Sequence, residues 1–192
     1  MIELQGEHVI LRALEREHCH ALWEMTETAG DVPTEHVQPG LAQENADKWF
    51  EEIQDKQGQT GVDFGVFTLE GKVIGHVQLH SIDWQDRSAE LGLGFARVSD
   101  RGKGYGTNAL QLIVSYAFDH LGLHRLAANP VAFNSSAIRV LEKCGFQLEG
   151  HQRDAFSFGG RWYDRVVFSI LEAEFRQLSD VQTSDLERKE DL

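Results

Sequence analysis

The chain has 192 residues, and at ~100–200 residues per domain this length favours one domain that can bury a sizeable core. Hydrophobic residues make up 41% and charged residues 26%, which is not the composition of a disordered chain. With 18 Lys and Arg against 31 Asp and Glu, the formal charge of −13 argues against sequence-independent nucleic-acid binding and against binding to an anionic membrane surface.

The first predicted elements are a strand over 8–14, a helix over 16–28 and a second helix over 41–57. The second helix places apolar side chains three and four residues apart, which is the spacing of an amphipathic helix. Between the two helices, residues 30–40 contain two prolines and therefore predict a loop.

Three strands are predicted next, over 63–69, 73–82 and 88–96. The first two are joined by Glu70-Gly71-Lys72, a short polar turn that is typical of a hairpin. A strong amphipathic helix is predicted over 106–121, because its apolar residues recur at the period of an α-helix.

The last predicted elements are a strand over 125–132, a helix over 135–143, and two strands over 146–158 and 162–170. The final two strands flank Gly159-Gly160, which is a hairpin signal. The order of elements predicts a mixed α/β fold with a mostly antiparallel sheet.

We expect one domain over residues 1–178 and a disordered polar tail over 179–192. The two cysteines, Cys19 and Cys144, fit neither a disulfide framework nor a metal-ligand spacing, so we expect reduced thiols, no metal and a cytoplasmic protein. The N-terminus lacks a signal-peptide pattern, and no window approaches the ~20 apolar residues of a membrane span.

The most informative segment is Asp100-Arg101-Gly102-Lys103-Gly104-Tyr105-Gly106-Thr107, between a predicted strand and the strongest predicted helix. Glycines let the backbone approach a ligand closely, and the helix N-terminus adds free N–H groups and a positive dipole, so the segment predicts a phosphate site. The spacing fits neither a Walker loop nor a dinucleotide fingerprint, because Arg97 and Thr107 stand where those motifs need glycine.

This loop resembles the pyrophosphate loop of the GCN5-related N-acetyltransferases (the GNAT family). A second motif agrees, because Asn134 is followed at fixed spacing by Ile138-Arg139, Glu142-Lys143 and Gly145-Phe146, a run similar to the RimJ/RimL-type branch that acetylates ribosomal-protein N-termini. The resemblance covers about residues 2–175.

The resemblance implies acetyl-CoA as the donor, a primary amine as the acceptor, and a central sheet that splays apart with helices on both of its faces. It places the pantetheine arm in the opening between the strands predicted over 88–96 and 125–132. The cofactor-binding residues that it implies are Phe95, Arg97, Arg101, Gly102, Lys103, Gly104, Tyr105, Gly106, Thr107 and Asn134.

Acyl transfer to an amine needs a base for the amine and a proton for the leaving thiolate. Glu90 is the candidate base, acting through water, and it lies on the strand face opposite Leu91. The acids usual in the family are absent, since Leu141 and Ala137 occupy their positions. Ser135 and Ser136 are candidate substitutes, and both are also expected as helix caps.

The acceptor side carries the candidates His76, His80, Trp84 and Asp154. The two histidines share one strand face, but no third ligand at a sensible spacing suggests a metal. A protein or peptide N-terminus is the first hypothesis for the acceptor. A small amine such as a polyamine, amino acid or antibiotic is the alternative, and a non-catalytic acyl-CoA sensor is the third. The protein is expected to be a monomer or a homodimer.

Overall fold

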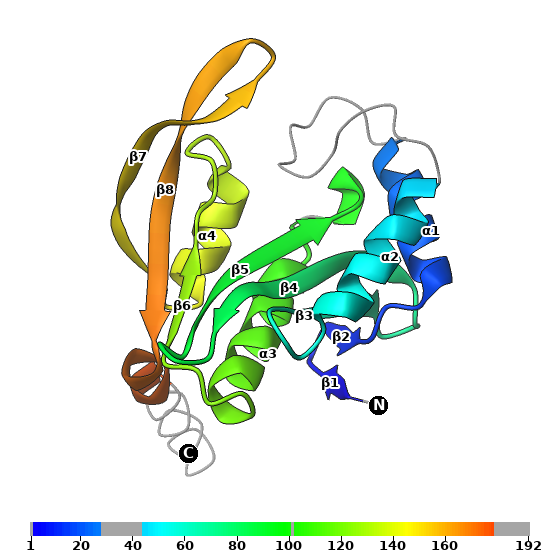
Figure 1. Cartoon of the computed structure of the whole chain (residues 1–192), viewed down its shortest axis with the longest axis horizontal. Helices are drawn as coiled ribbons and strands as arrows, with labels where there is room; N and C mark the ends of the chain where they lie inside the picture. The colour runs from blue at the N-terminus through cyan, green and yellow to red at the C-terminus, as the bar shows by residue number, and fades with distance from the viewer. Residues whose placement is uncertain (1, 28–43, 101, 179–192) are drawn as a thin grey trace, which may run out of the picture.

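A computed structural model describes residues 2–27, 44–100 and 102–178 as a mixed α/β fold (Figure 1). One eight-stranded sheet forms its centre, in the order β1-β2-β3-β4-β5-β6-β8-β7. The strands, with their bounds, are β1 (Glu3–Gln5), β2 (Val9–Arg12), β3 (Val62–Thr68), β4 (Val73–Asp83), β5 (Ser88–Phe95), β6 (Arg125–Ala128), β7 (Gln147–Phe158) and β8 (Arg161–Leu171).

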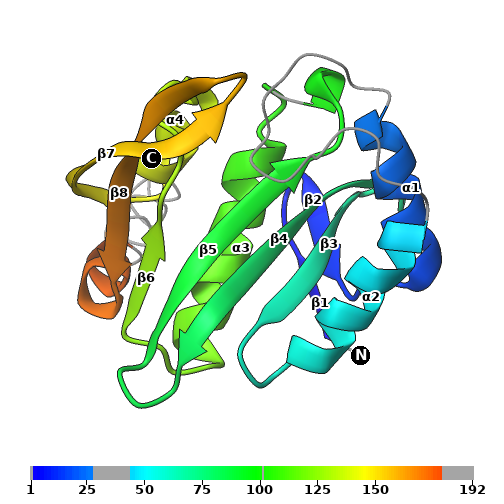
Figure 2. The same ribbon diagram turned by 45° about the horizontal axis from the view of Figure 1, so that its top comes forward.

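Helices cover both faces of the sheet, as expected (Figure 2). They are α1 (Arg16–Glu27), α2 (Glu44–Lys56), α3 (Tyr105–Asp119) and α4 (Ser135–Lys143), with a short 3-10 turn, η1, over Val98–Asp100. The main apolar core lies between α3 and the sheet, where Ile113 and Leu110 meet Val77 and Leu79 of β4. A second, smaller core joins α1 and α2 to the other face.

The sheet is antiparallel everywhere except between β5 and β6. These two parallel strands are paired over three positions only, the last of which joins Glu90 to Ala127. Beyond that pair the strands diverge, so the sheet opens toward the C-terminal end of β5 (Figures 1 and 2). The splayed sheet that the family resemblance implied is therefore present.

Three features differ from the sequence prediction. Strand β1 was missed, because a three-residue segment with Leu4 as its only apolar side chain depends on pairing with β2. The strand expected over 125–132 ends at Ala128, since Pro130 lacks the N–H that a continuing ladder needs. Residues 172–178, just after β8, form a helix, where no element was predicted within the expected domain.

The loop expected over 30–40 and the tail expected over 179–192 lie outside the described residues. Within the described residues, no helix combines the length and the apolar character needed to cross a membrane.

Candidate active site

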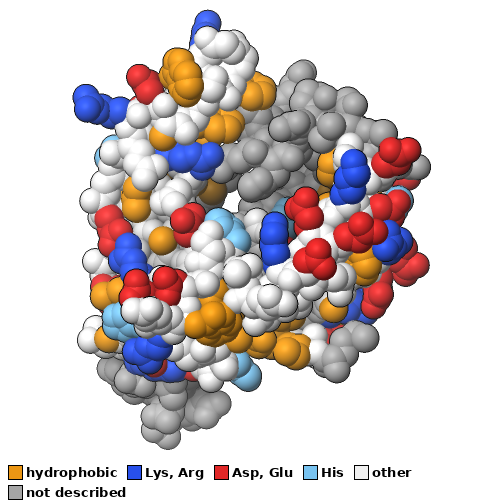
Figure 3. Space-filling model, in the orientation of Figure 1, with side chains coloured by type: hydrophobic (Ala, Val, Ile, Leu, Met, Phe, Trp, Pro, Cys, Tyr) orange, Lys and Arg blue, Asp and Glu red, His pale blue; other side chains and the backbone are white. Residues whose placement is uncertain are grey.

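The opening between β5 and β6 exposes the backbone of β5. Ala96 N–H donates to Ile74 C=O on β4 at 3.0 Å, and an antiparallel ladder alternates its hydrogen-bonding sides. The backbone groups of Leu93 and Phe95, beyond the last pair with β6, therefore point away from β4, toward the opening. Figure 3 shows the surface hollowed over this region. An extended chain of amides can bind here as a strand would.

The glycine-rich connection joins β5 to α3 at the open end. Gly102 (φ +75) and Gly104 (φ +83) adopt left-handed conformations that favour glycine. Gly104 is the N-cap of α3 and provides no capping side chain. The first helical bond runs from Asn108 N–H to Gly104 C=O, so the N–H groups of residues 105–107 have no partner within the helix. This arrangement is suited to an anion.

The charges around this connection are partly paired. Lys103 Nζ lies 3.7 Å from Asp100 Oδ1 and 5.8 Å from the ring centre of Tyr105. Asp100 is buried, and its Oδ2 has no hydrogen-bond partner among the described residues. Sequence reasoning missed this pairing, although Asp100 opens the motif. Arg97 is exposed, and Arg101 lies outside the described residues.

The start of α3 packs closely on its neighbours. A Cβ at Gly106 would lie 3.4 Å from Phe95 Cε2 and 3.5 Å from Val140 Cγ2, which are ordinary van der Waals distances, so the helix start lies against both β5 and α4. Cys144 Sγ lies 3.7 Å from the carbonyl oxygen of Thr107. These contacts fix the helix N-terminus beside the open edge of β5.

Neither cysteine is suited to act as a nucleophile. Burial raises the pKa of Cys19 and of Cys144 to about 12, so both remain protonated thiols at neutral pH. Because the thiolate is the reactive form, an acyl-cysteine intermediate is disfavoured, and direct transfer between two bound substrates is the simpler chemistry.

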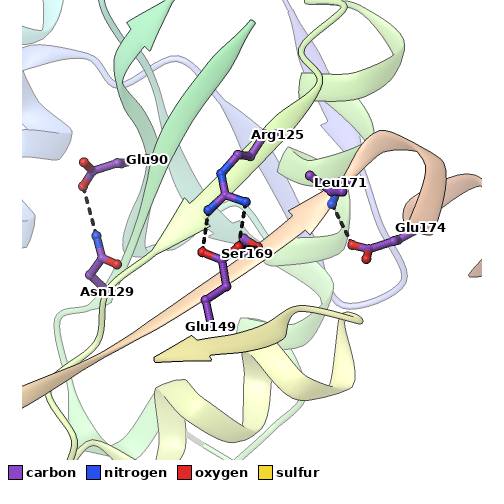
Figure 4. Close-up of polar contacts among 7 residues, drawn as sticks. All are labelled: Glu90, Arg125, Asn129, Glu149, Ser169, Leu171 and Glu174. Atoms are coloured by element: carbon purple, nitrogen blue, oxygen red, sulfur yellow. Dashed lines mark hydrogen bonds and ion pairs between the residues drawn. The ribbon is translucent and has the colours of Figure 1, made fainter. Parts of the chain in front are cut away.

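Glu90 lies at the base of the opening, with its side chain exposed. It is the register partner of His80 on β4, so the two are neighbours across the hairpin. Asn129 Nδ2 donates a hydrogen bond to Glu90 Oε2 at 3.4 Å (Figure 4). His80 Nδ1 lies 3.2 Å from Ser81 Oγ. The base candidate therefore sits within a small set of polar side chains.

Sequence reasoning missed Asn129, because it fell inside the strand predicted over 125–132. The Asn129-Pro130 pair is a signal that could have found it, since the residue before proline is biased toward a turn or the end of an element.

His76 and Gln78 share the face of β4 that carries His80. The His76 ring meets Trp49 of α2 edge-on, with 5.2 Å between ring centres, and Gln78 is the register partner of Asp63 on β3. Burial raises the pKa of Asp63 to about 6. Among residues 2–27, 44–100 and 102–178, no group of three or more His, Cys, Asp or Glu side chains is arranged to hold a metal ion.

The start of α4 differs from expectation. Asn134 is the N-cap, and its Oδ1 accepts the N–H of Ala137 at 3.2 Å. Ser135 and Ser136 are the first two helical residues rather than caps, and both are exposed. Leu141 is buried in the main core. The cap uses one side of the Asn134 amide and leaves its Nδ2 group for other partners.

Two candidate acceptor residues lie elsewhere. Trp84 occupies the turn between β4 and β5, where its indole N–H donates to Gln59 C=O at 2.5 Å. That turn is at the end of β5 that pairs with β6, opposite to the glycine-rich connection. Asp154 lies on β7, which β8 separates from β6 in the sheet order, and its N–H donates to Asp164 Oδ1.

A network of charged and polar side chains links the strands on the other side of β6. Arg125 Nη1 and Nη2 donate to the two oxygens of Glu149 at 2.8 and 2.5 Å, and Ser169 Oγ donates to Glu149 Oε1 at 2.8 Å (Figure 4). These bonds join β6, β8 and β7. The hydrogen bonds from Arg125, and then from Ser169, lower the pKa of Glu149 to about 2.

Glu149→Gln should destabilise the protein in a pH-dependent way. A carboxyl whose pKa is depressed on folding adds stability above its unfolded pKa of ~4.5, and that stability is lost as pH falls toward 2. Because both partners are more than a third exposed, we expect about 1 kcal/mol, or a Tm lower by about 2–4 °C at pH 7. Thermal unfolding should show a smaller difference from the parent protein at pH 3. The same change at Glu142, an exposed residue of α4, is the control, and an equal difference at both pH values would contradict the assignment.

Comparison with known proteins adds to this geometry. A sequence profile described as "Acetyltransferase (GNAT) domain" matches residues 8–147. The "Probable N-acetyltransferase YjcK" of Bacillus subtilis is 39% identical over 116 residues, which cover 59% of this chain and 64% of that protein. The "Putative ribosomal N-acetyltransferase YdaF" of the same organism is 34% identical over 115 residues, covering 60% and 62%. The matches thus span less than two thirds of these curated relatives.

Among solved structures, a chimera of the spermidine N-acetyltransferase SpeG from Vibrio cholerae and hSSAT has the same fold. It superposes with a TM-score of 0.77 at 26% identity, covering 87% of this chain and 97% of that one.

Proposed function

The chain belongs to the acetyltransferase (GNAT) family, and on that premise we propose that it transfers an acetyl group from acetyl-CoA to the α-amine of a protein or peptide N-terminus. One observation carries the proposal. A proton acceptor, Glu90, and an anion site, the glycine-rich connection, lie at opposite ends of the same open strand edge.

The residues fit acetyl-CoA part by part. The N–H groups of residues 105–107, with the left-handed Gly102 and Gly104, suit a pyrophosphate. The outward backbone groups of Leu93 and Phe95 suit the amides of a pantetheine arm. Lys103 adds a cation, which acts locally because salt screens the distant net charge beyond ~10 Å. Asn134 is proposed to hold the thioester end.

The bound thioester supplies an activated acyl carbon. The amine nitrogen forms a bond to that carbon, the carbon–sulfur bond breaks, and the amine proton passes through water to the Glu90 carboxylate. An outward N–H of β5 stabilises the oxyanion. Leu141 is buried and Ala137 carries no acid, so the sulfur leaves as a thiolate, which a thiol of pKa ~8.5 permits. Water, or the exposed hydroxyl of Ser135 or Ser136, then supplies its proton.

An α-amine suits a site with a single base. Its pKa of ~8 makes the neutral form cost ~1.4 kcal/mol at pH 7, against ~4.6 kcal/mol for a lysine side chain. The side of the opening formed by β7 and β8 also suits a peptide. Arg165 Nη1 donates to Asn129 C=O and its guanidinium lies 5.3 Å from the ring centre of Phe156, while Phe133 packs on Tyr163. The fixed Arg165 cation disfavours a polycation at this side of the opening, while the aromatic rings can pack on an uncharged peptide.

A polyamine is the second candidate acceptor. The similarity to a spermidine N-acetyltransferase chimera favours it, and so does the acidic character of α2. That helix carries Glu44, Asp47, Glu51, Glu52 and Asp55.

The test is turnover with acetyl-CoA and a panel of acceptors, followed as free thiol. We expect thiol release with peptides that have a free N-terminus, and none above background with the same peptides N-acetylated but carrying an internal lysine. Faster release with spermidine would favour the second candidate. Tight CoA binding without thiol release from any acceptor would instead indicate the non-catalytic acyl-CoA sensor.

A further inference from the structure

Asn129 follows β6 at the point where the sheet opens. The pairing of β5 with β6 ends at Glu90 and Ala127. Just beyond, Val166 N–H donates to Pro130 C=O at 2.9 Å, which fastens the chain to β8. Asn129 therefore stands on the rim of the opening that faces Glu90.

The backbone of Asn129 is held from β8 by a second contact. Arg165 Nη1 donates to its carbonyl oxygen at 2.7 Å, and the Arg165 guanidinium lies over the ring of Phe156. A charged donor makes a stronger hydrogen bond than a neutral one, and the aromatic ring limits the movement of the guanidinium. These contacts therefore fix the backbone position of the residue that carries the Asn129 side chain.

The Asn129 amide is used on one side only. Its Nδ2 donates to Glu90 Oε2 at 3.4 Å, while its Oδ1 is buried and has no hydrogen-bond partner in the described part of the chain (Figure 4). Turning the amide over would place its oxygen against the carboxylate, so charge dictates the observed orientation. A buried unpaired carbonyl destabilises a fold, so stability alone does not account for this side chain.

We infer that Asn129 is a positioning residue for acetyl transfer: its amide holds the Glu90 carboxylate at the opening between β5 and β6, where that carboxylate receives the acceptor's proton. The inference rests on the proposed function. It assigns Asn129 no contact with the substrates, and it makes the effect of Asn129 depend on the presence of a carboxylate at position 90.

The test compares Asn129→Asp and Asn129→Ala with the parent protein, using thiol release with the peptide acceptor that is turned over fastest. The aspartate keeps the size of the side chain but replaces the donor with a carboxylate that repels Glu90, whereas the alanine removes the donor without adding a charge. We expect kcat to fall ~10-fold in both variants, with the KM for acetyl-CoA changed less than ~2-fold. In a Glu90→Gln background, Asn129→Ala should change kcat less than ~2-fold further, because the group it positions has gone.

Gln147→Glu is the matched control. Gln147 Nε2 donates to Glu174 Oε1 at 2.7 Å, so this variant also sets a carboxylate against a carboxylate, but on β7. It should leave kcat unchanged. If Asn129→Ala has its full effect in the Glu90→Gln background, the inference is overturned while the proposed function stands. If the parent protein releases no thiol with any acceptor, the proposed function fails and this inference fails with it.

Discussion

Glu90→Gln is expected to lower kcat by about 100-fold or more while leaving the Kd for acetyl-CoA within ~2-fold. The amide keeps the shape of the side chain and its exposed position on β5 but cannot take up the proton that the attacking amine releases. The loss should be larger at pH 6 than at pH 9, since at the higher pH more of an acceptor of pKa ~8 is already neutral. Initial rates of thiol release across that range, together with calorimetric titration of CoA, measure both quantities.

Glu149→Gln is the control for this change, because it makes the same replacement on β7, outside the opening. It should keep kcat near that of the parent protein. A Glu90→Gln protein with unaltered kcat at every pH would remove Glu90 as the base.

Gly102→Glu is expected to weaken CoA binding on the order of 100-fold, or ~2.7 kcal/mol. The new carboxylate would stand in the connection whose N–H groups, with the N-terminus of α3, attract a pyrophosphate. Chain neighbours aside, no heavy atom of the described residues lies within 4 Å of where its Cβ would be, so the effect should come from charge and backbone conformation rather than a clash. Calorimetric titration of CoA measures the loss, and circular dichroism reports whether the fold is kept.

Gly71→Glu distinguishes an effect of the new charge from an effect of the backbone conformation. Gly71 (φ +86), in the turn between β3 and β4, is as left-handed as Gly102 (φ +75) and equally open, so the same side chain brings the same backbone strain there. It should bind CoA as the parent does. Equal affinity in the Gly102→Glu protein would contradict the assignment of the phosphate site.

Elements with local signals were predicted closely. The helix predicted over 135–143 has those bounds in the structure, because Asn134 supplies a cap and Gly145 (φ +86) a left-handed end close by in sequence. Strand β1 and the end of β6 were not predicted correctly. Strand β1 is too short to show a pattern of its own and depends on pairing with β2. The end of β6 comes just before Asn129-Pro130, a local signal that the prediction over 125–132 did not use.

In the candidate site, the glycine turns have a local sequence signal, whereas the contact between Asn129 and Glu90 has none. The left-handed turns at Gly102 and Gly104 follow from the sequence, since glycine next to a helix start signals them. The bond between Asn129 and Glu90 joins residues 39 apart, and no pattern within either strand reveals it. Only the register of β5 against β6 brings these two side chains together. The roles assigned to Glu90, Ser135 and Ser136 and to the acceptor residues remain predictions.

The short pairing of β5 with β6 has a consequence for self-association. A sheet normally has two edges, but this one has part of a third in its interior, where the outward backbone groups of Leu93 and Phe95 lie beyond the last residue pair of β5 with β6. Open strand edges recruit other chains, and proteins usually blunt them with charge, bulges or cover. A ligand that binds along this edge as a strand would also shield it. Occupancy of the opening would then protect the protein against aggregation as well as prepare it for chemistry.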